Sequence, residues 1–301
     1  MSPRPRRPIR LAAVLALLAA AGALAACAPE GAPSGGEDAA PASAGPDLRA
    51  AAEAIFAGEG VRWIDLTHPL DEANVYWPTA KQFELTEVAA DSTEAGYWYA
   101  ANDFAAAEHG GTHFDAPYHF AADGWSAEEV PLASLRGPAA VIDVADSARA
   151  NPDYRVSVAD LRGWEAEHGR LPGGGIVLID SGWEERWPEE ERVLGTAERG
   201  PAATDDLHFP GLHPEAARWL VEERDVDLVG LDTPSIDHGP STEFMAHRIL
   251  YEANVVGLEN VARLDELPAS GAYVLVLPMK IRGGSGGPAR VVALVPEAAG
   301  G

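Results

Sequence analysis

Cysteine is almost absent from this sequence: the 301 residues include one, Cys27. A lone thiol cannot form a disulfide within the chain, so packing alone must hold the folded part together. Basic residues are also scarce, because 22 lysines and arginines face 47 aspartates and glutamates, for a net charge of −25. Such a chain repels phosphates and anionic lipid headgroups, so we expect no nucleic-acid partner. The sequence also lacks internal repeats and a glycine-rich nucleotide-binding motif.

Long hydrophobic runs are missing too. The longest apolar run covers residues 11–26, which is shorter than the roughly 20 residues of a membrane span. It follows a basic stretch, MSPRPRRPIR, and ends in small residues, as in a secretory signal peptide. The end of the run reads Leu-Ala-Ala-Cys27 and resembles the lipobox of bacterial lipoproteins. The resemblance implies lipidation of Cys27 and anchoring to a membrane facing the periplasm or cell exterior. The alternative is an ordinary signal peptide with an incidental cysteine.

The chain is therefore expected to have three parts. Residues 1–26 are a lipoprotein signal peptide, and residues 27–47 are a lipidated cysteine followed by a flexible tether rich in Pro, Gly, Ala and Ser. Residues 48–301 form a single domain, long enough to enclose a hydrophobic core. Membrane contact is expected only through the lipid.

Short runs rich in β-branched and aromatic residues, bounded by turn formers, predict many strands. They cover residues 61–67, 82–88, 97–101, 139–144, 176–180, 227–231, 255–258, 273–277 and 290–294. Three stretches predict helices: residues 158–169 after Ser157, residues 214–224 from Pro214, and residues 243–253. The mixture predicts an α/β or α+β fold.

The densest chemistry lies in EHGGTHFDAPYH, residues 108–119. This stretch holds three histidines and an aspartate: His109, His113, Asp115 and His119. Gly110-Gly111 and Pro117 disfavour a helix, and the glutamate of the HExxH zinc motif is absent. On a straight strand, His109 and Asp115 would lie about 20 Å apart at roughly 3.3 Å per residue. We therefore expect a bend at Gly110-Gly111, with His113 and Asp115 together on one face of a strand.

Two imidazoles and a carboxylate suit zinc, manganese or ferrous iron in a site with room for water. The alternative is that these histidines are ordinary core or loop residues with hydrogen-bond partners and no ion. Three histidines with an aspartate beside a Gly-Gly bend favour the metal site.

A second motif, Gly283-Gly284-Ser285-Gly286-Gly287, matches the G-x-S-x-G pattern of serine hydrolases. In the fold that uses this pattern, the catalytic acid and histidine follow the serine in sequence. The last histidine here is His247, so we interpret residues 283–287 as a glycine loop.

Residues 109–119 also match H-x-G-T-H-x-D-x-P-x-H throughout. This pattern resembles that of the cyclase family of metal-dependent hydrolases, which includes bacterial kynurenine formamidase and isatin hydrolase. The resemblance implies an α/β fold, the strand-rich swivelling β/β/α domain with a few packed helices. It implies that His109, His113 and Asp115 bind a divalent metal, Zn or Mn, and that His119 is the catalytic acid/base. In this scheme hydroxide on the metal attacks a carbonyl, and His119 returns the proton to the leaving nitrogen.

The same resemblance implies a second metal, held by a histidine and a glutamate twelve residues apart and bridged by the aspartate. His247 and Glu259 have this spacing, so we expect one or two ions per subunit. Alternatively, His247 is a packed helix residue and Glu259 begins a solvated loop. The family element G-[IL]-D-x-x-S-x-D matches residues 230–237, where turn chemistry explains Asp232 and Asp237 equally well.

Substrate contacts are predicted for Trp77 and Trp183, with Trp187 a further candidate, although large aromatic residues are more often packing. Residues 183–213 are longer than in compact formamidases and look more like the isatin hydrolase branch. The resemblance also implies a homodimer or homotetramer.

Together these features predict an exported, metal-dependent hydrolase of C–N bonds in small amides or cyclic amides, similar to arylformamidases. The alternative is an exported lipoprotein that binds metal or a small ligand without catalysis. His119 distinguishes the two, because a binding protein tolerates its loss and a hydrolase does not.

Overall fold

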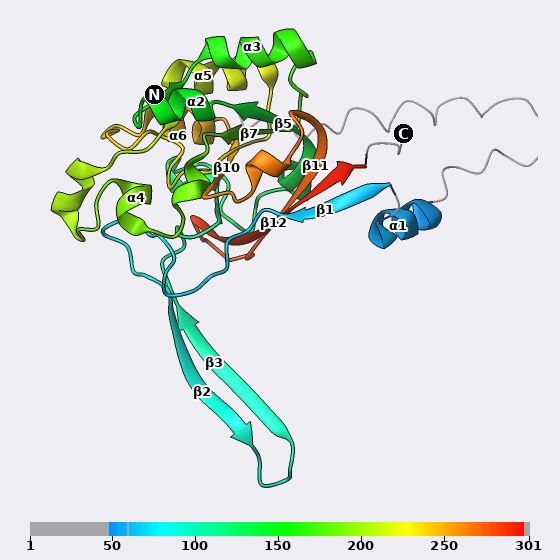
Figure 1. Ribbon diagram of the computed structural model, residues 1–301, viewed down its shortest axis with the longest axis vertical. Helices are drawn as coiled ribbons and strands as arrows, with labels where there is room; N and C mark the ends of the chain where they lie inside the picture. Colours follow the sequence, from blue (N-terminus) through cyan, green and yellow to red (C-terminus); the bar gives the residue numbers. More distant parts are fainter. Residues whose placement is uncertain (1–47, 59, 298–301) are drawn as a thin grey trace, which may run out of the picture. The chain divides into compact units, whose positions relative to one another are not determined.

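An eight-stranded mixed sheet organises the protein. The computed structural model describes residues 48–58 and 60–297 (Figure 1); the predicted signal peptide, Cys27 and the tether lie outside them. The strand order is β1-β12-β11-β5-β7-β9-β10-β4, and β12 also pairs with β4, so the row of strands closes on itself. The strands are β1 (Val61–Asp65), β4 (His113–Asp115), β5 (Arg136–Asp143), β7 (Ile176–Asp180), β9 (Leu228–Leu231), β10 (Val256–Glu259), β11 (Ser270–Pro278) and β12 (Gly286–Pro296).

The parallel strands β5, β7, β9 and β10 are covered on both faces. Along β7, Leu178 enters one hydrophobic core, whereas its neighbours Val177 and Ile179 enter the other. Strands buried on both sides read as continuous apolar runs, which is why Ile176–Asp180 lacks a polar alternation.

Helices cover one face of this sheet (Figure 1). They are α2 (Ala145–Ala150), α3 (Val158–His168), α5 (Pro214–Trp219) and α6 (Met245–Glu252). Helix α3 begins as the sequence predicts: the Ser157 hydroxyl accepts from the N–H groups of Ala159 and Asp160, and the Asp160 carboxylate accepts from the Ser157 N–H. Helix α5 starts at Pro214 and continues as one π-helical turn, Leu220–Arg224. None of the described helices is long and apolar enough to cross a membrane.

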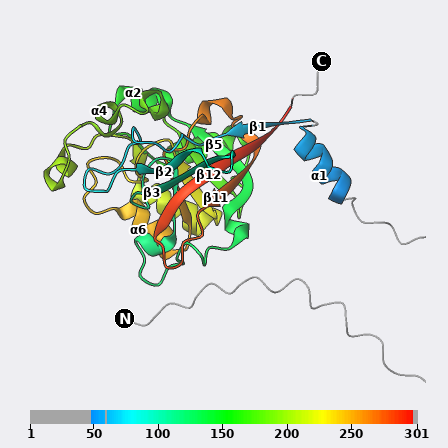
Figure 2. The same ribbon diagram turned by 90° about the horizontal axis from the view of Figure 1, so that it is seen from below.

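A separate hairpin, the arm (residues 84–105), is formed by β2 (Glu84–Ser92) and β3 (Trp98–Ala105). It extends away from the closed sheet in Figure 1 and is seen end-on from below in Figure 2. Nearly every residue of both strands is exposed. The exposed residues include large apolar and aromatic side chains: Leu85, Val88, Tyr97, Trp98, Tyr99 and Phe104.

The segment from residue 183 to 213 packs as a third cluster beside the main sheet. It contains α4 (Glu190–Leu194), the 3-10 turns Trp183–Arg186 and Pro201–Asp206, and β8 (Gly211–Leu212), which pairs with β6 (Arg155–Val156). Further 3-10 turns cover Pro117–His119, Leu132–Leu135 and Leu264–Glu266. Helix α1 (Leu48–Ala57) precedes β1, and the Trp63 indole N–H donates to the carbonyl of Ile55.

Candidate metal centre and cavity

The predicted bend forms at Gly110-Gly111. Gly111 has a φ of +59°, and a Cβ on Gly110 would lie 2.0 Å from the Tyr76 ring. Glycine is therefore required at both positions, one for its backbone angle and one for the close approach. After the bend the chain enters β4, where His113 lies opposite Glu259 of β10. The sheet register thus brings two segments with metal-ligand chemistry together.

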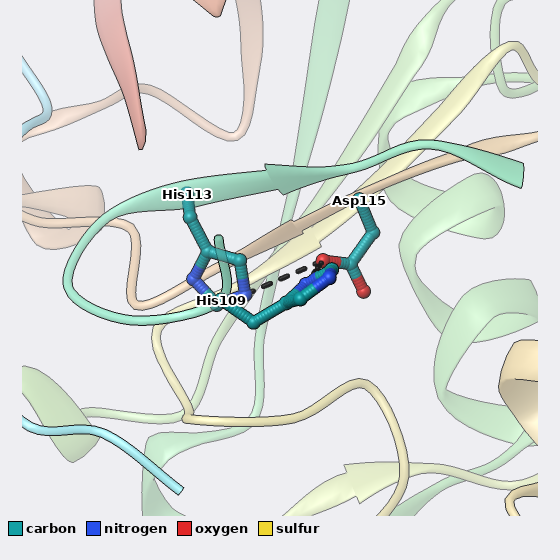
Figure 3. Close-up of side chains that lie close together, drawn as sticks. All are labelled: His109, His113 and Asp115. Atoms are coloured by element: carbon teal, nitrogen blue, oxygen red, sulfur yellow. Dashed lines mark hydrogen bonds and ion pairs between the residues drawn. The ribbon is translucent and has the colours of Figure 1, made fainter. Parts of the chain in front are cut away.

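Two histidines of the motif, His109 and His113, converge on one oxygen atom of Asp115 (Figure 3). Asp115 Oδ1 lies 2.7 Å from His109 Nδ1 and 3.3 Å from His113 Nε2. His113 and Asp115 are almost fully buried, whereas the His109 ring is partly exposed. These three atoms are close enough together to hold a single ion.

A second group shares the same aspartate. Helix α6 contributes His247, whose Nε2 lies 3.7 Å from Asp115 Oδ2 and 3.1 Å from Glu259 Oε1. Asp115, His247 and Glu259 are all buried and also lie close enough to hold an ion. Glu259 is therefore buried and not part of a solvated loop. His247 has polar neighbours and is not packed among apolar residues alone. One carboxylate faces both groups.

The polar chemistry of these residues fits a divalent cation. His113 Nε2 is buried and has no hydrogen-bond partner, although the carboxylates of Asp115 and Glu259 lie within 3.3 Å. Burial alone would lower the pKa of His113, but these two carboxylates outweigh it and raise the pKa to about 10. Buried carboxylates need compensating positive charge, which a proton on the imidazole or a metal ion can supply.

His247 is held by an aspartate of the 230–237 element. Asp237 Oδ2 lies 2.7 Å from His247 Nδ1 and accepts from the His247 backbone N–H at 3.0 Å. Such a carboxylate fixes the tautomer of a metal-binding histidine. Asp232 instead accepts from the Ser181 hydroxyl and from the backbone N–H groups of Ser181 and Trp183, so it stabilises the turn after β7.

His119 lies at the end of the 3-10 turn Pro117–His119 and stacks on His109, with ring centroids 3.9 Å apart. Burial lowers the pKa of His119 to about 4, despite the opposing charge of Asp115. The ring is therefore neutral at neutral pH and able to accept a proton.

A cavity of about 280 Å³ opens over these groups. Its lining includes His109, His113, His119, His247 and Glu259 together with three large aromatic residues, Trp77, Phe120 and Phe244. Trp77 therefore lies in the cavity lining, and its contact with substrate stays a prediction. The sequence analysis did not place Phe120 and Phe244 in the cavity lining. Their positions could have suggested it, because Phe120 directly follows His119 and Phe244 precedes His247 by about one helical turn.

Trp183 does not line this cavity, contrary to the sequence-based expectation. Its side chain is 2% exposed, and its indole N–H donates to the carbonyl of Val193 at 2.9 Å. It packs in the third cluster with Phe209, which in turn contacts Trp77 edge-on. Trp187 also lies outside the cavity lining and stacks on His68. The indole of Trp183 thus supports the wall behind Trp77, because burial of a large aromatic surface is favourable there.

The closed sheet and the histidine and carboxylate cluster on β4, α6 and β10 define an α/β protein with a candidate metal site. Residues 64–238, more than half of the chain, match the family model "Putative cyclase", and the chain belongs to this family. The family resemblance read from residues 109–119 is therefore confirmed.

Similar proteins include an isatin hydrolase from Roseibium aggregatum, 36% identical over 168 residues, which are 54% of this chain and 61% of that protein. A kynurenine formamidase from Salinibacter ruber is 30% identical over 168 residues, 56% of this chain and 66% of that protein. In both alignments the chain spans less than two thirds of the relative's length. The structure of isatin hydrolase A from Ralstonia solanacearum superposes with a TM-score of 0.76 at 34% identity, covering 84% of this chain and 99% of that one. The predicted α/β cyclase fold is confirmed.

Proposed function

We propose that this protein is a divalent-metal-dependent hydrolase of C–N bonds in small amides or cyclic amides. The observation that carries the proposal is the convergence of two candidate ligand groups on Asp115 beneath a cavity that His119 also lines. The similar proteins named isatin hydrolase and kynurenine formamidase support this substrate class, since isatin is a cyclic amide and formylkynurenine a formamide.

The residues around the cavity have separate roles in binding and in proton transfer. When bound, a divalent metal would supply Lewis acidity, which acidifies water and stabilises negative charge on a carbonyl oxygen. His119, neutral at neutral pH, accepts a proton at its imidazole and returns it to the departing nitrogen. Trp77, Phe120 and Phe244 offer flat apolar surfaces that orient an aromatic substrate and exclude water.

The metal is proposed to be Zn or Mn, with one or two ions per subunit. His109, His113 and Asp115 would hold one ion, and His247 and Glu259 would hold a second with the shared aspartate. Mixed nitrogen and oxygen donors suit both metals.

The protein is further proposed to be a homodimer or homotetramer. The support is the arm, whose exposed apolar side chains form a surface that monomeric proteins rarely leave open. Export and lipidation at Cys27 remain proposals that rest on the lipobox pattern in the sequence. Lipid labelling of cells that make the protein, with Cys27→Ser as control, tests them.

The proposed activity is tested on the purified full chain by metal analysis and by hydrolysis of N-formylkynurenine and isatin. We expect bound Zn or Mn and turnover in the wild type. His119→Ala should keep its metal and lose roughly 10²–10⁴-fold in rate, the usual contribution of a general acid/base.

Two results would contradict this expectation. Absence of bound metal after reconstitution would exclude the metal-dependent mechanism. Bound metal without turnover of any small amide or lactam, together with ligand binding unchanged in His119→Ala, would favour a lipoprotein that binds metal or a small ligand without catalysis.

A further inference from the structure

The glycine loop at residues 283–287 lies directly against the metal-binding motif. Strand β12 begins at Gly286, which is paired with Asp115 of β4. The backbone N–H of Ala116 donates to the carbonyl of Ser285 at 2.9 Å. Backbone pairing therefore fixes the position of Ser285 relative to the motif.

The Ser285 side chain connects His109 to an acid. Its Oγ lies 2.8 Å from His109 Nε2 and donates to Glu108 Oε2 at 2.6 Å, and the Ser285 backbone N–H donates to the same oxygen at 2.9 Å. Because the Ser285 hydroxyl donates its hydrogen bond to the Glu108 carboxylate, its oxygen accepts a hydrogen bond from His109 Nε2–H. Without a metal, the 2.7 Å contact between His109 Nδ1 and Asp115 Oδ1 is a hydrogen bond donated by Nδ1–H; a metal ion bound at Nδ1 would replace that proton while Nε2–H stays on Ser285.

The flanking glycines make these contacts sterically possible. A Cβ on Gly286 would lie 2.6 Å from His109 Cε1, and a Cβ on Gly284 would lie 2.8 Å from Glu108 Oε1. Real Cβ atoms do not approach other atoms so closely, so any side chain at position 284 or 286 would displace the acid or the imidazole. The close packing therefore requires glycine at positions 284 and 286, the two x positions of the G-x-S-x-G pattern.

We propose that Ser285 and Glu108 are positioning residues that hold His109 with Nδ1 directed at the metal. This inference rests on the proposed metal-dependent function. A ligand histidine whose second ring nitrogen donates to a fixed acceptor keeps its tautomer and orientation, and the carboxylate behind the acceptor increases its basicity.

A nucleophilic role for Ser285 is the competing explanation, since Ser285, His109 and Asp115 have the hydrogen-bonded arrangement of a catalytic triad. Two observations oppose it. The Ser285 hydroxyl donates its hydrogen bond to the Glu108 carboxylate instead of to His109, and the negative charge of that carboxylate would destabilise an oxyanion formed beside Oγ. Ser285 is also not among the residues that line the cavity.

The test is calorimetric titration of Zn²⁺ or Mn²⁺ into the metal-free full chain of the wild type, Ser285→Ala and Glu108→Gln. We expect the Kd for metal to rise about 10- to 100-fold in each single variant. In the double variant the losses should not add, because both residues act through His109. The visible spectrum of the Co²⁺-loaded protein should change in the same variants, since it reports ligand geometry.

Glu128→Gln is the matched control. Glu128 accepts from the backbone N–H of Gly283 in the same loop at 2.7 Å and carries the same charge, but it contacts Ser126 instead of His109. Its metal affinity should stay within about twofold of the wild type, because no ligand histidine depends on it.

Three outcomes would overturn the inference. Wild-type affinity in both Ser285→Ala and Glu108→Gln would show that neither residue positions His109. Unchanged affinity in Ser285→Ala with lost turnover, and labelling of wild-type Ser285 by a fluorophosphonate, would identify a nucleophile. Absence of metal binding in the wild type would remove the proposed function and this inference together. If the wild type binds metal but hydrolyses no amide, and the variants bind metal more weakly, the inference would be supported and only the proposed activity contradicted.

Discussion

Two buried aspartates have pKa values displaced in opposite directions. Burial alone would raise the pKa of Asp115, but the charge of His109 and contacts with neighbouring histidines hold it well below its usual range. In the described part of the chain no cation pairs with Asp232, and burial raises its pKa to about 7 despite hydrogen bonds from Ser181 and Trp183. The surrounding charge therefore decides whether a buried carboxyl group is ionised.

The raised pKa of Asp232 predicts a pH dependence of stability. Because the folded-state pKa lies above the unfolded value, the contribution of Asp232 is complete at low pH and is lost as the pH rises towards 7. Between pH 5 and 7 the loss should be roughly 2–3 kcal/mol, at about 1.36 kcal/mol per unit. The measurement is urea unfolding of the wild type and Asp232→Asn across this range. Parallel curves for the two proteins would contradict the prediction.

At the scale of elements, the arm differs from every other part of the described chain. The register pairs Leu85 with Phe104, yet both are more than half exposed, and the two strands form a sheet of their own. A two-stranded hairpin is marginally stable by itself in water. A partner surface is therefore expected to cover it.

Polar substitution of the arm should weaken self-association. We expect Trp98→Thr with Tyr99→Thr to lower the molar mass measured by light scattering from that of an oligomer towards that of a monomer, because both aromatic residues are exposed. Leu132→Ser, an exposed apolar residue outside the arm, is the control and should leave the mass unchanged. A wild type that is already monomeric, or an arm variant of unchanged mass, would contradict the proposed role.

For the whole molecule, the candidate metal centre ties together β4, β10 and α6. Without a cation, the carboxylates of Asp115 and Glu259 are balanced by protons on His113 and His247, whose pKa values are both raised to about 10. Metal binding replaces these protons and links segments far apart in the sequence.

Metal should accordingly stabilise the whole fold. At a free metal concentration of 100 times Kd, the free energy of unfolding should rise by about 2.7 kcal/mol per ion. For a protein of this size that is a rise in Tm of roughly 5–10 °C. Calorimetry with Zn²⁺ or Mn²⁺ against a chelator tests this, and Asp115→Asn should abolish the shift. Equal Tm values for the wild type under both conditions would exclude a metal site of useful affinity.

The sequence by itself determined the features that depend on neighbouring residues. Ser157 begins α3, Pro214 begins α5, and the Gly110-Gly111 bend precedes a short strand that carries His113 and Asp115. The predicted strands at 176–180 and 255–258 appear as β7 and β10 with nearly the same bounds. Backbone sterics, capping and side-chain periodicity act over a few residues, so the local sequence carries their outcome.

Only the tertiary structure decided which distant residues meet. The spacing of His247 and Glu259 suggested a second ligand pair, but the register of β4 against β10 and the packing of α6 bring that pair to Asp115. The tertiary structure also buries Trp183 instead of placing it in the cavity lining. It brings Ser285 beside His109, although every histidine precedes Ser285 in the sequence. Helices α1, α2 and α4 were likewise not anticipated. These outcomes depend on how sheets and helices pack over long sequence separations, and no local pattern encodes that arrangement.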